Sequence, residues 1–230
     1  MGWLSLKEMR RQIHCLLHPR RKMAFIFSIP KSAKVLDVGC GNSSPVITMT
    51  ARPDLRYTGL DVCDYEQEAP ANDYSEEYVV VSSENFAAEI MKRQNRYDAV
   101  ICCHNLEHCT EQEQVLIAML RALRKNGTIF LAFPCADSVR FPSREGTLNF
   151  FDDKTHTKPP DFPWILNTLS EEGFKITFAQ RRYRPWRHFM IGLLLEPISR
   201  MKKKVIKGTW SLYGFESIIW AKKTSHSEGS

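Results

Sequence analysis

Residues 34–42, KVLDVGCGN, place an acidic residue inside an apolar run and two glycines directly after that run. A short run rich in β-branched residues favours a buried strand, and the glycines favour a tight turn at its end. Glycine at a strand-to-helix turn lets a ligand lie against the backbone, because a side chain would block the approach. The stretch therefore predicts a strand over 34–38, a ligand-binding turn, and a helix that begins near Ser43 or Ser44.

Strand-like and helix-like segments alternate outward from this stretch, which is typical of a parallel sheet covered by helices. The capping-box sequence Thr110-Glu111-Gln112-Glu113 predicts a helix start at Thr110, and this helix is expected to run to about Arg124. A second helix is predicted over 163–172. The further strands are predicted over 56–60, 78–81, 97–102, 128–133, 174–179 and 213–221.

Length and composition favour a single globular domain inside the cell. The chain has 230 residues, of which 43% are hydrophobic, and its seven cysteines form no Cys-x-x-Cys pair. An odd set of cysteines in apolar runs indicates reduced thiols and argues against a disulfide framework or a zinc ribbon. No apolar stretch suits a secretory signal, and residues 189–195 are far shorter than the roughly 20 residues of a membrane span. We expect a cytoplasmic protein, with the membrane surface as an alternative location.

The net charge of +6 is concentrated in two segments. Residues 1–34 hold eight Lys or Arg against one Glu, and residues 181–207 hold nine against one Glu. Basic segments with interleaved aromatic residues suit an anionic membrane surface, an acidic substrate or nucleic acid. A solvated basic face is the plainer explanation of the same pattern.

These patterns divide the chain into a basic helical extension, a main domain and a short tail. The extension is expected over 1–32, the domain over 33–223 and a disordered tail over 224–230. Within the domain, 134–162 is expected to be a substrate loop, because it is rich in Pro, Asp, Ser and Thr. Residues 184–210 are expected to form a basic amphipathic insertion that either contacts a membrane or covers the pocket.

A second acidic residue, Asp61, follows Gly41 by 20 residues at the end of the second strand. A carboxylate in that position can accept both hydroxyls of a ribose, as in enzymes that use NAD or adenosylmethionine. Ser44 stands where a dinucleotide fingerprint has its third glycine, and no Tyr-x-x-x-Lys pair is recognisable. Both observations disfavour a nicotinamide oxidoreductase. The segment 82–85, SSEN, would place polar groups beside an adenine ring.

The order of these motifs resembles that of the class I, Rossmann-like S-adenosylmethionine-dependent methyltransferases. The resemblance covers about residues 33–180 and rests on VLDVGCG at 35–41, GLD at 59–61, YDAV at 97–100 and LEH at 106–108. It implies an α/β fold: a doubly wound, mostly parallel seven-stranded sheet with helices on both faces and an antiparallel C-terminal strand. It implies S-adenosyl-L-methionine as cofactor, bound by Asp37, Gly39, Gly41, Asp61, Ser83, Glu84, Asn85 and His104.

The segment 104–108, HNLEH, matches the His-x-x-Glu-His pattern of zinc hydrolases. Such a site needs both histidines on one helix, and the capping box starts the helix only afterwards, so the hydrolase interpretation fails. One remaining interpretation is a metal-free pocket wall, as in many similar methyltransferases. The other is a divalent ion, as in some O-methyltransferases similar to quinone-ring and small-RNA 3′-end methylators, held here by His104, Glu107, His108 and His156. The metal-free site is the favoured interpretation, because His104 stands where those enzymes have Glu and makes magnesium a poor match.

Methyl transfer to a hydroxyl requires alignment of donor and acceptor and removal of a proton. His108 and His156 are the candidate catalytic bases, His108 first, since imidazole titrates near neutral pH. The segment 151–156 also resembles methyltransferases of surface-glycan and natural-product pathways. We therefore predict O-methylation of a small-molecule, glycan or lipid-linked acceptor. The alternatives are RNA methylation and a non-catalytic protein of the same fold that binds or scaffolds.

Overall fold

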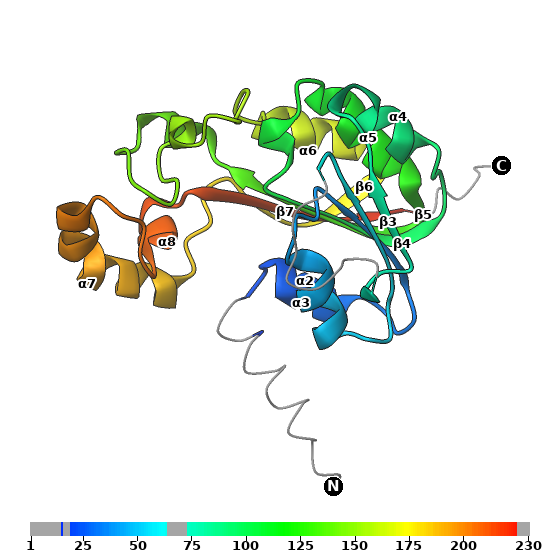
Figure 1. The fold of residues 1–230 in the computed structure, drawn as a ribbon, viewed down its shortest axis with the longest axis horizontal. Coiled ribbons are helices and arrows are strands. Elements are labelled where there is room, and N and C mark those ends of the chain that lie inside the picture. The colour runs from blue at the N-terminus through cyan, green and yellow to red at the C-terminus, as the bar shows by residue number, and fades with distance from the viewer. Residues whose placement is uncertain (1–14, 16–18, 64–72, 225–230) are drawn as a thin grey trace, which may run out of the picture.

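The structure is a computed structural model that describes residue 15 and residues 19–63 and 73–224. Most of the predicted N-terminal extension and nearly all of the predicted tail lie outside these residues. The described chain forms one seven-stranded sheet between two layers of helices (Figure 1).

The strands follow the order β3-β2-β1-β4-β5-β7-β6 across the sheet. Neighbours from β3 through to β5 pair in parallel, whereas β7 is antiparallel to both β5 and β6. This confirms the predicted fold class, including the antiparallel last strand. The strands are β1 (Lys34–Val38), β2 (Arg56–Asp61), β3 (Glu77–Val80), β4 (Tyr97–Cys103), β5 (Leu123–Pro134), β6 (Phe174–Gln180) and β7 (Glu216–Lys223).

Helices cover both faces of the sheet because its central strands are apolar on both sides. One buried cluster joins the sheet to α4, α5 and α6, and the other joins the opposite face to α2 and α3 (Figure 1). The helices are α2 (Lys22–Ser28), α3 (Ser44–Ala51), α4 (Phe86–Met91), α5 (Gln112–Ala122), α6 (Phe162–Glu171), α7 (Trp186–Lys202) and α8 (Thr209–Tyr213). Short 3₁₀ helices lie at Ser83–Asn85, Leu106–His108, Ala136–Arg140 and Phe150–Asp152.

Helix α2 is part of the core, although its residues fall within the predicted extension. Phe25 and Ile26 are buried, and the Phe25 ring lies 5.6 Å from Phe130 of β5 and 5.2 Å from Trp220 of β7. The folded unit therefore begins before residue 33.

Three predicted boundaries around α5 are wrong. The helix begins at Gln112, its preceding residue Glu111 makes no capping hydrogen bond with its side chain, and the helix already ends at Ala122. The next strand begins at Leu123 instead of Thr128. Leu123 pairs with Tyr97 ahead of an irregular stretch, and regular pairing resumes at Thr128, so the strand includes the residues just before its predicted start.

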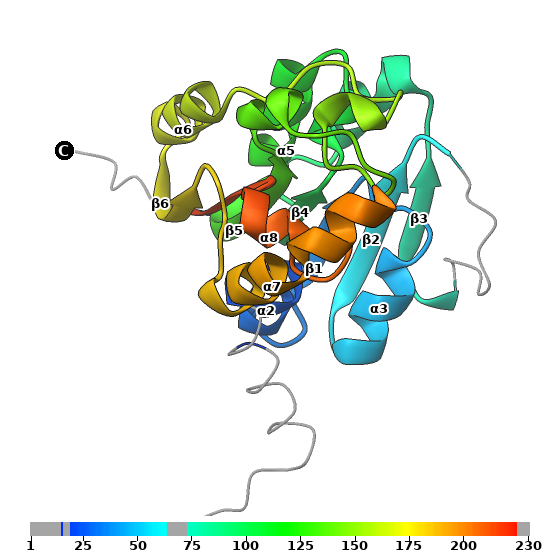
Figure 2. The same cartoon turned by 90° about the vertical axis from the view of Figure 1, so that its left-hand side faces the viewer.

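Residues 186–213 form a lobe of two helices at the end of the sheet where the parallel strands finish (Figures 1 and 2). The last strand, β7, begins at Glu216, three residues after its predicted start at Tyr213. The reason is that Tyr213 ends α8 and Gly214 turns the chain with φ +64°. The lobe is joined to the predicted substrate loop by the bidentate pair of Arg144 with Glu196 of α7, at 2.9 and 2.5 Å. Among the described helices, none is long and apolar enough to span a membrane.

Candidate functional site

The turn after β1 has two glycines with left-handed backbone angles, and each has a different surrounding. Gly39 has φ +71°, and a Cβ added there would lie 2.2 Å from the Asn105 side chain. Gly41 has φ +59°, and a Cβ added there would have nothing within 4 Å. Gly39 therefore lets the segment after β4 pack against the turn, whereas Gly41 borders open space in which a ligand can approach the backbone.

Asp61 ends β2 beside this turn, as the sequence predicts. Its Oδ2 accepts a hydrogen bond from the Gly41 backbone N–H at 2.7 Å, and its Oδ1 accepts one from the Val62 N–H, also at 2.7 Å. Burial raises the pKa of Asp61, and the backbone N–H groups counteract part of that rise. The backbone N–H groups of Gly41 and Val62 thus hold the carboxylate at the rim of the open space next to Gly41.

Asp37 is fully buried inside β1, and its two oxygens differ in their partners. Oδ2 accepts hydrogen bonds from Lys22 Nζ at 2.9 Å, Ser44 Oγ at 2.5 Å and Tyr57 OH at 2.8 Å. Oδ1 is buried with no hydrogen-bond partner among the described atoms. Burial by itself lowers the pKa of Lys22, but the charge of Asp37 outweighs it and the net pKa is raised, so this lysine stays protonated.

The predicted adenine-side residues lie in an exposed 3₁₀ helix, Ser83–Asn85, directly after β3. Glu84 makes hydrogen bonds with its own backbone and with Ser82 and Ser83, which lower its pKa. These residues are at the same edge of the sheet as Gly41 and Asp61, because the carboxyl ends of parallel strands meet there. Their role in adenine binding stays a prediction.

His104 follows β4 and is held between two carboxylates. Its Nδ1 lies 3.1 Å from Glu107 Oε1, and its Nε2 lies 3.2 Å from Glu216 Oε1. Burial alone would lower the pKa of His104, but the two hydrogen bonds outweigh it and the pKa is raised well above the ordinary value. Because a carboxylate oxygen can only accept a hydrogen bond, each ring nitrogen of His104 donates to its carboxylate. Since a metal ligand needs a free lone pair, the structure separates His104 from the predicted metal set.

The partners of His108 and His156 select the same tautomer in each ring. Thr155 Oγ1 donates its proton to Asp153 Oδ1 at 2.6 Å, so at 2.8 Å from His108 Nδ1 it can only accept. His156 Nδ1 lies 2.6 Å from the Phe150 carbonyl, which also only accepts. Each Nδ1 therefore carries the hydrogen, and in the neutral rings each Nε2 keeps its lone pair.

Glu107 completes a three-residue cluster with these histidines. Glu107 is fully buried, and its Oε2 has no hydrogen-bond partner among the described atoms. Ligand atoms of Glu107, His108 and His156 lie within 4.8 Å of one another, and the two imidazole centroids are 4.8 Å apart. Three of the four predicted metal ligands are thus brought together by a 3₁₀ helix after β4 and the loop near residue 155.

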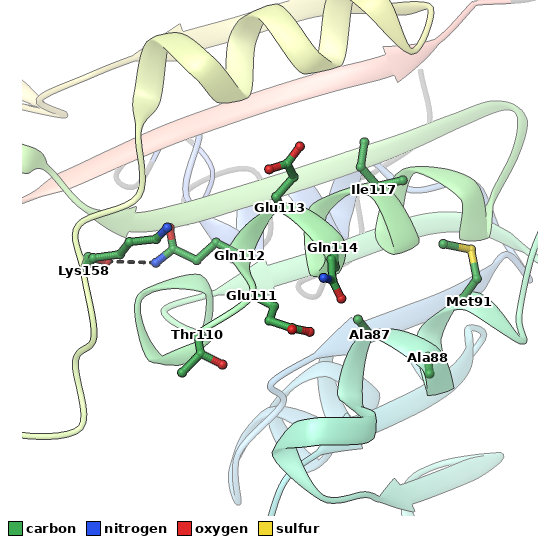
Figure 3. A pocket seen from close by; sticks show the side chains of 10 residues that line it. All are labelled: Ala87, Ala88, Met91, Thr110, Glu111, Gln112, Glu113, Gln114, Ile117 and Lys158. Carbon is green, nitrogen blue, oxygen red and sulfur yellow. Dashed lines mark hydrogen bonds between the residues drawn. The ribbon is translucent and has the colours of Figure 1, made fainter.

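A cleft of about 680 Å³ lies between α4 and the N-terminal half of α5 (Figure 3). Ala87, Ala88 and Met91 form one wall, and Gln112 on the other donates from Nε2 to the Lys158 carbonyl at 2.9 Å. None of the predicted site residues lines this cleft. We therefore place the site at the glycine turn and the histidine cluster, where the unpaired buried oxygens are.

Sequence reasoning missed the side chains that position the predicted ones. Lys22 was counted as part of a basic surface segment, yet it is bonded to Asp37. Asn105 lies against Gly39, and Thr155 orients His108. No spacing rule identifies these partners, although a lysine between apolar residues 23–27 and the arginines at 20 and 21 was the one available signal for Lys22.

Comparison with known proteins agrees with this arrangement. A family model described as a methyltransferase domain matches residues 36–131, which include the end of β1, the glycine turn, Asp61 and the histidine of the 3₁₀ helix after β4. An ubiquinone biosynthesis O-methyltransferase of Xanthomonas axonopodis pv. citri is 27% identical over 203 residues, covering 81% of each chain.

A protein of the same description from Xanthomonas oryzae pv. oryzae is 31% identical over 172 residues, covering 68% of this chain and 69% of that one. Among solved structures, a 1,6-didemethyltoxoflavin-N1-methyltransferase of Burkholderia thailandensis, with bound S-adenosylhomocysteine, has a TM-score of 0.56 at 15% identity and covers 98% and 93% of the two chains. The structural likeness extends over nearly the whole fold.

Proposed function

This chain belongs to the class I S-adenosylmethionine-dependent methyltransferases, and from that membership we propose that it methylates a hydroxyl group on a small-molecule, glycan or lipid-linked acceptor. The observation that carries the proposal is the cluster of Glu107, His108 and His156 beside the glycine turn. A hydroxyl must lose its proton during methylation, and this cluster offers proton acceptors. The relatives described as O-methyltransferases support the same acceptor chemistry.

The residues at the turn fit the cofactor. The open space at Gly41 admits a ligand against the backbone, and Asp61 at its rim can accept ribose hydroxyls with the lone pairs that the backbone leaves free. The unpaired Oδ1 of Asp37 is a buried acceptor suited to an ammonium group such as that of the methionine part. When bound, S-adenosylmethionine supplies an electrophilic methyl group on a sulfonium.

Proton removal is assigned to His108 when the cluster holds no ion. Asp153 is ionised, since hydrogen bonds from Thr155 lower its pKa against the effect of burial. Asp153 and Thr155 fix the ring of His108 with Nδ1 protonated, so Nε2 is the atom that accepts the hydroxyl proton. The Asp-Thr-His chain then stabilises the imidazolium that forms.

Acceptor screening tests this proposal directly. Transfer of a labelled methyl group from S-adenosylmethionine is measured to catechol, to ortho-phenylenediamine, to mixed glycans and to RNA. We expect label on hydroxyl acceptors and none on the diamine. Label on the diamine alone would contradict hydroxyl chemistry, and label on RNA alone would move the acceptor to nucleic acid.

Substitution of Gly41 by Ala separates the ligand role of this turn from its folding role. The added methyl meets no protein atom within 4 Å, so only the left-handed backbone angle opposes it, at a cost of about 1–2 kcal/mol in the free energy of unfolding. The methyl does occupy the space assigned to the cofactor. We expect binding of S-adenosylhomocysteine, measured by calorimetry, to weaken by at least about tenfold, which corresponds to about 1.4 kcal/mol of binding free energy.

Gly39→Ala is the matched control. It has a similar left-handed backbone angle, but its methyl would lie 2.2 Å from the Asn105 side chain. The midpoint temperature of thermal unfolding should therefore fall much further than in Gly41→Ala. Normal binding by folded Gly41→Ala would contradict the placement of the cofactor.

The unpaired Glu107 oxygen favours a second arrangement of the same cluster, with a divalent ion at its centre. A buried carboxylate oxygen without a partner is costly, and a cation facing it would remove that cost. One carboxylate and two imidazoles suit Mn²⁺, Fe²⁺, Co²⁺ or Zn²⁺ better than Mg²⁺. A bound ion would occupy the His108 lone pair and would lower the pKa of a coordinated hydroxyl.

Metal binding is tested on the purified chain after chelator treatment and reloading. We expect about one Mn²⁺ or Zn²⁺ per chain by elemental analysis, and none in His156→Ala, because one of three ligands is lost. Cys63→Ser is a control, because it removes an exposed thiol that could compete for zinc and is not part of the cluster. Metal-free protein that turns over at the full rate, unchanged by chelator, would contradict the ion and leave His108 as the base.

A further inference from the structure

Helix α7 is apolar on two faces, and only one of them is covered. Its inner face packs on α8: Gly192 is buried, and a Cβ there would lie 2.3 Å from the Gly208 carbonyl oxygen. The opposite face carries large apolar side chains that are 43% to 76% exposed. We call this the outer α7 face, and it consists of Trp186, Met190, Leu193, Leu194, Ile198 and Met201.

These six side chains form one continuous stripe, because they recur at intervals of one, three or four residues along the helix. Exposed apolar side chains scattered singly need no explanation, but a continuous stripe of this size marks an interaction surface. The helix has 17 residues and is therefore about 25 Å long. It presents a convex ridge, which suits a broad surface better than a small ligand.

The margins of the outer α7 face are strongly basic. Residues 181–207 hold nine Lys or Arg and one acidic residue, Glu196, which is already paired with Arg144. The guanidinium of Arg187 lies 5.6 Å from the Trp186 ring, at the edge of the stripe. Within residues 19–63 and 73–224, no acidic side chain forms an ion pair with Arg187, Arg200, Lys202, Lys203 or Lys207.

A cavity of about 570 Å³ lies beside the stripe, between residues 142–144 and α7. Arg200 and Lys203 are among its lining residues, together with Tyr213. Positive charge in the lining of a cavity next to an apolar ridge matches the arrangement of phosphate groups above acyl chains at a bilayer surface.

We propose that the outer α7 face docks onto an anionic membrane surface, with α7 lying in the plane of the interface. The apolar stripe enters the region between headgroups and acyl chains, and the unpaired basic side chains contact lipid phosphates. A second copy of this chain is a poor occupant, because a symmetric contact would bring two strongly basic segments together.

Docking would turn the end of the sheet that carries the site toward the membrane. Trp210 of α8 donates from Nε1 to the Thr147 carbonyl at 2.9 Å, and its ring lies 5.5 Å from that of His104. The lobe is thereby fixed to the segment after β5 and to the end of β4, at the edge of the sheet that carries the site (Figure 2). Vesicle binding itself does not depend on methyl transfer, whereas delivery of a lipid-linked acceptor rests on the proposed function.

Sedimentation with vesicles tests the docking. The purified full chain is mixed with vesicles of phosphatidylcholine, or of phosphatidylcholine with 30% phosphatidylglycerol, and the bound fraction is measured against salt. We expect at least about tenfold stronger partitioning to the anionic vesicles, falling as salt rises, since each basic residue near the surface contributes to attraction.

Two variants and a control make the test specific. Leu193→Asp combined with Leu194→Asp removes the centre of the stripe, and Lys202→Glu combined with Lys203→Glu reverses charge at its margin. Each pair should lower partitioning by about tenfold or more while leaving binding of S-adenosylhomocysteine unchanged. Ile47→Asp alters an apolar side chain of α3 that is 51% exposed, and it should leave vesicle binding intact.

Three results would overturn the docking: no vesicle binding by the wild type, equal binding by the leucine variant, or equal affinity for neutral vesicles. A wild-type dimer that the leucine variant dissociates, measured by sedimentation velocity without vesicle binding, would assign the face to a second copy instead. Docking without methyl transfer would leave the surface established and refute only the proposed function.

Discussion

His108→Ala is expected to lower the turnover number for a hydroxyl acceptor by about 10²–10⁴-fold, because the variant loses the group that accepts the proton or holds the ion. Binding of S-adenosylhomocysteine should stay within about twofold of wild type, since contacts at the glycine turn are unchanged. The measurement is steady-state methyl transfer beside calorimetry of the cofactor product. Loss of turnover with normal binding separates an acceptor-side role from a cofactor-side role.

Thr155→Val is the matched variant for the orientation of His108. Thr155 is exposed, so the substitution should leave folding intact, but it removes the oxygen that accepts from His108 Nδ1. We expect an intermediate loss, roughly 10-fold, with a shifted pH profile of turnover, because the imidazolium loses its link to Asp153. Full turnover in His108→Ala would refute both the base and the ion at this position.

Asp61→Ala is expected to weaken binding of S-adenosylmethionine by about 100-fold or more. A carboxylate that accepts two ribose hydroxyls makes two charge-assisted hydrogen bonds, each worth about 1.5–3 kcal/mol. The variant also leaves the Gly41 and Val62 N–H groups without their acceptor, which loosens the turn. Calorimetric titration with S-adenosylmethionine and S-adenosylhomocysteine measures both effects on affinity.

Glu76→Ala is the control for loss of a carboxylate next to β2 but away from the glycine turn. Glu76 is exposed and pairs with Arg56, at the opposite end of β2 from Asp61. We expect unchanged affinity, since an exposed ion pair contributes little and lies away from the glycine turn. Comparable weakening in both variants would show that Asp61 acts through general stability, and the ribose assignment would then fall.

The sequence identified the residues of the cofactor side more completely than it identified the arrangement of the acceptor side. Gly39, Gly41 and Asp61 were identified from their positions at strand ends, and all three lie at the carboxyl edge of the sheet. The four predicted metal ligands were read from a short pattern plus one distant histidine. Only the structure shows that Glu107, His108 and His156 lie close together. It also shows that both ring nitrogens of His104 are hydrogen-bonded, one to Glu107 and the other to Glu216.

The partner of Asp37 illustrates the same limit. Lys22 and Asp37 are 15 residues apart, and nothing in their spacing distinguishes this buried pair from a solvated surface charge. The position of α2 under the sheet depends on packing of Phe25 and Ile26 against β5 and β7, strands far along the chain. A lysine in that helix is therefore directed at β1 by contacts that no local pattern encodes.

By itself, the sequence determined the alternation of strands and helices, the glycine turn and the acid at the end of β2. These are local properties, set by the period of apolar residues and by backbone angles that glycine tolerates. The tertiary structure decided which side chains meet: His104 with Glu216 across 112 residues, and His108 with Thr155 across 47. Such contacts depend on the directions in which packed elements project their side chains, and sequence separation carries no information about those directions.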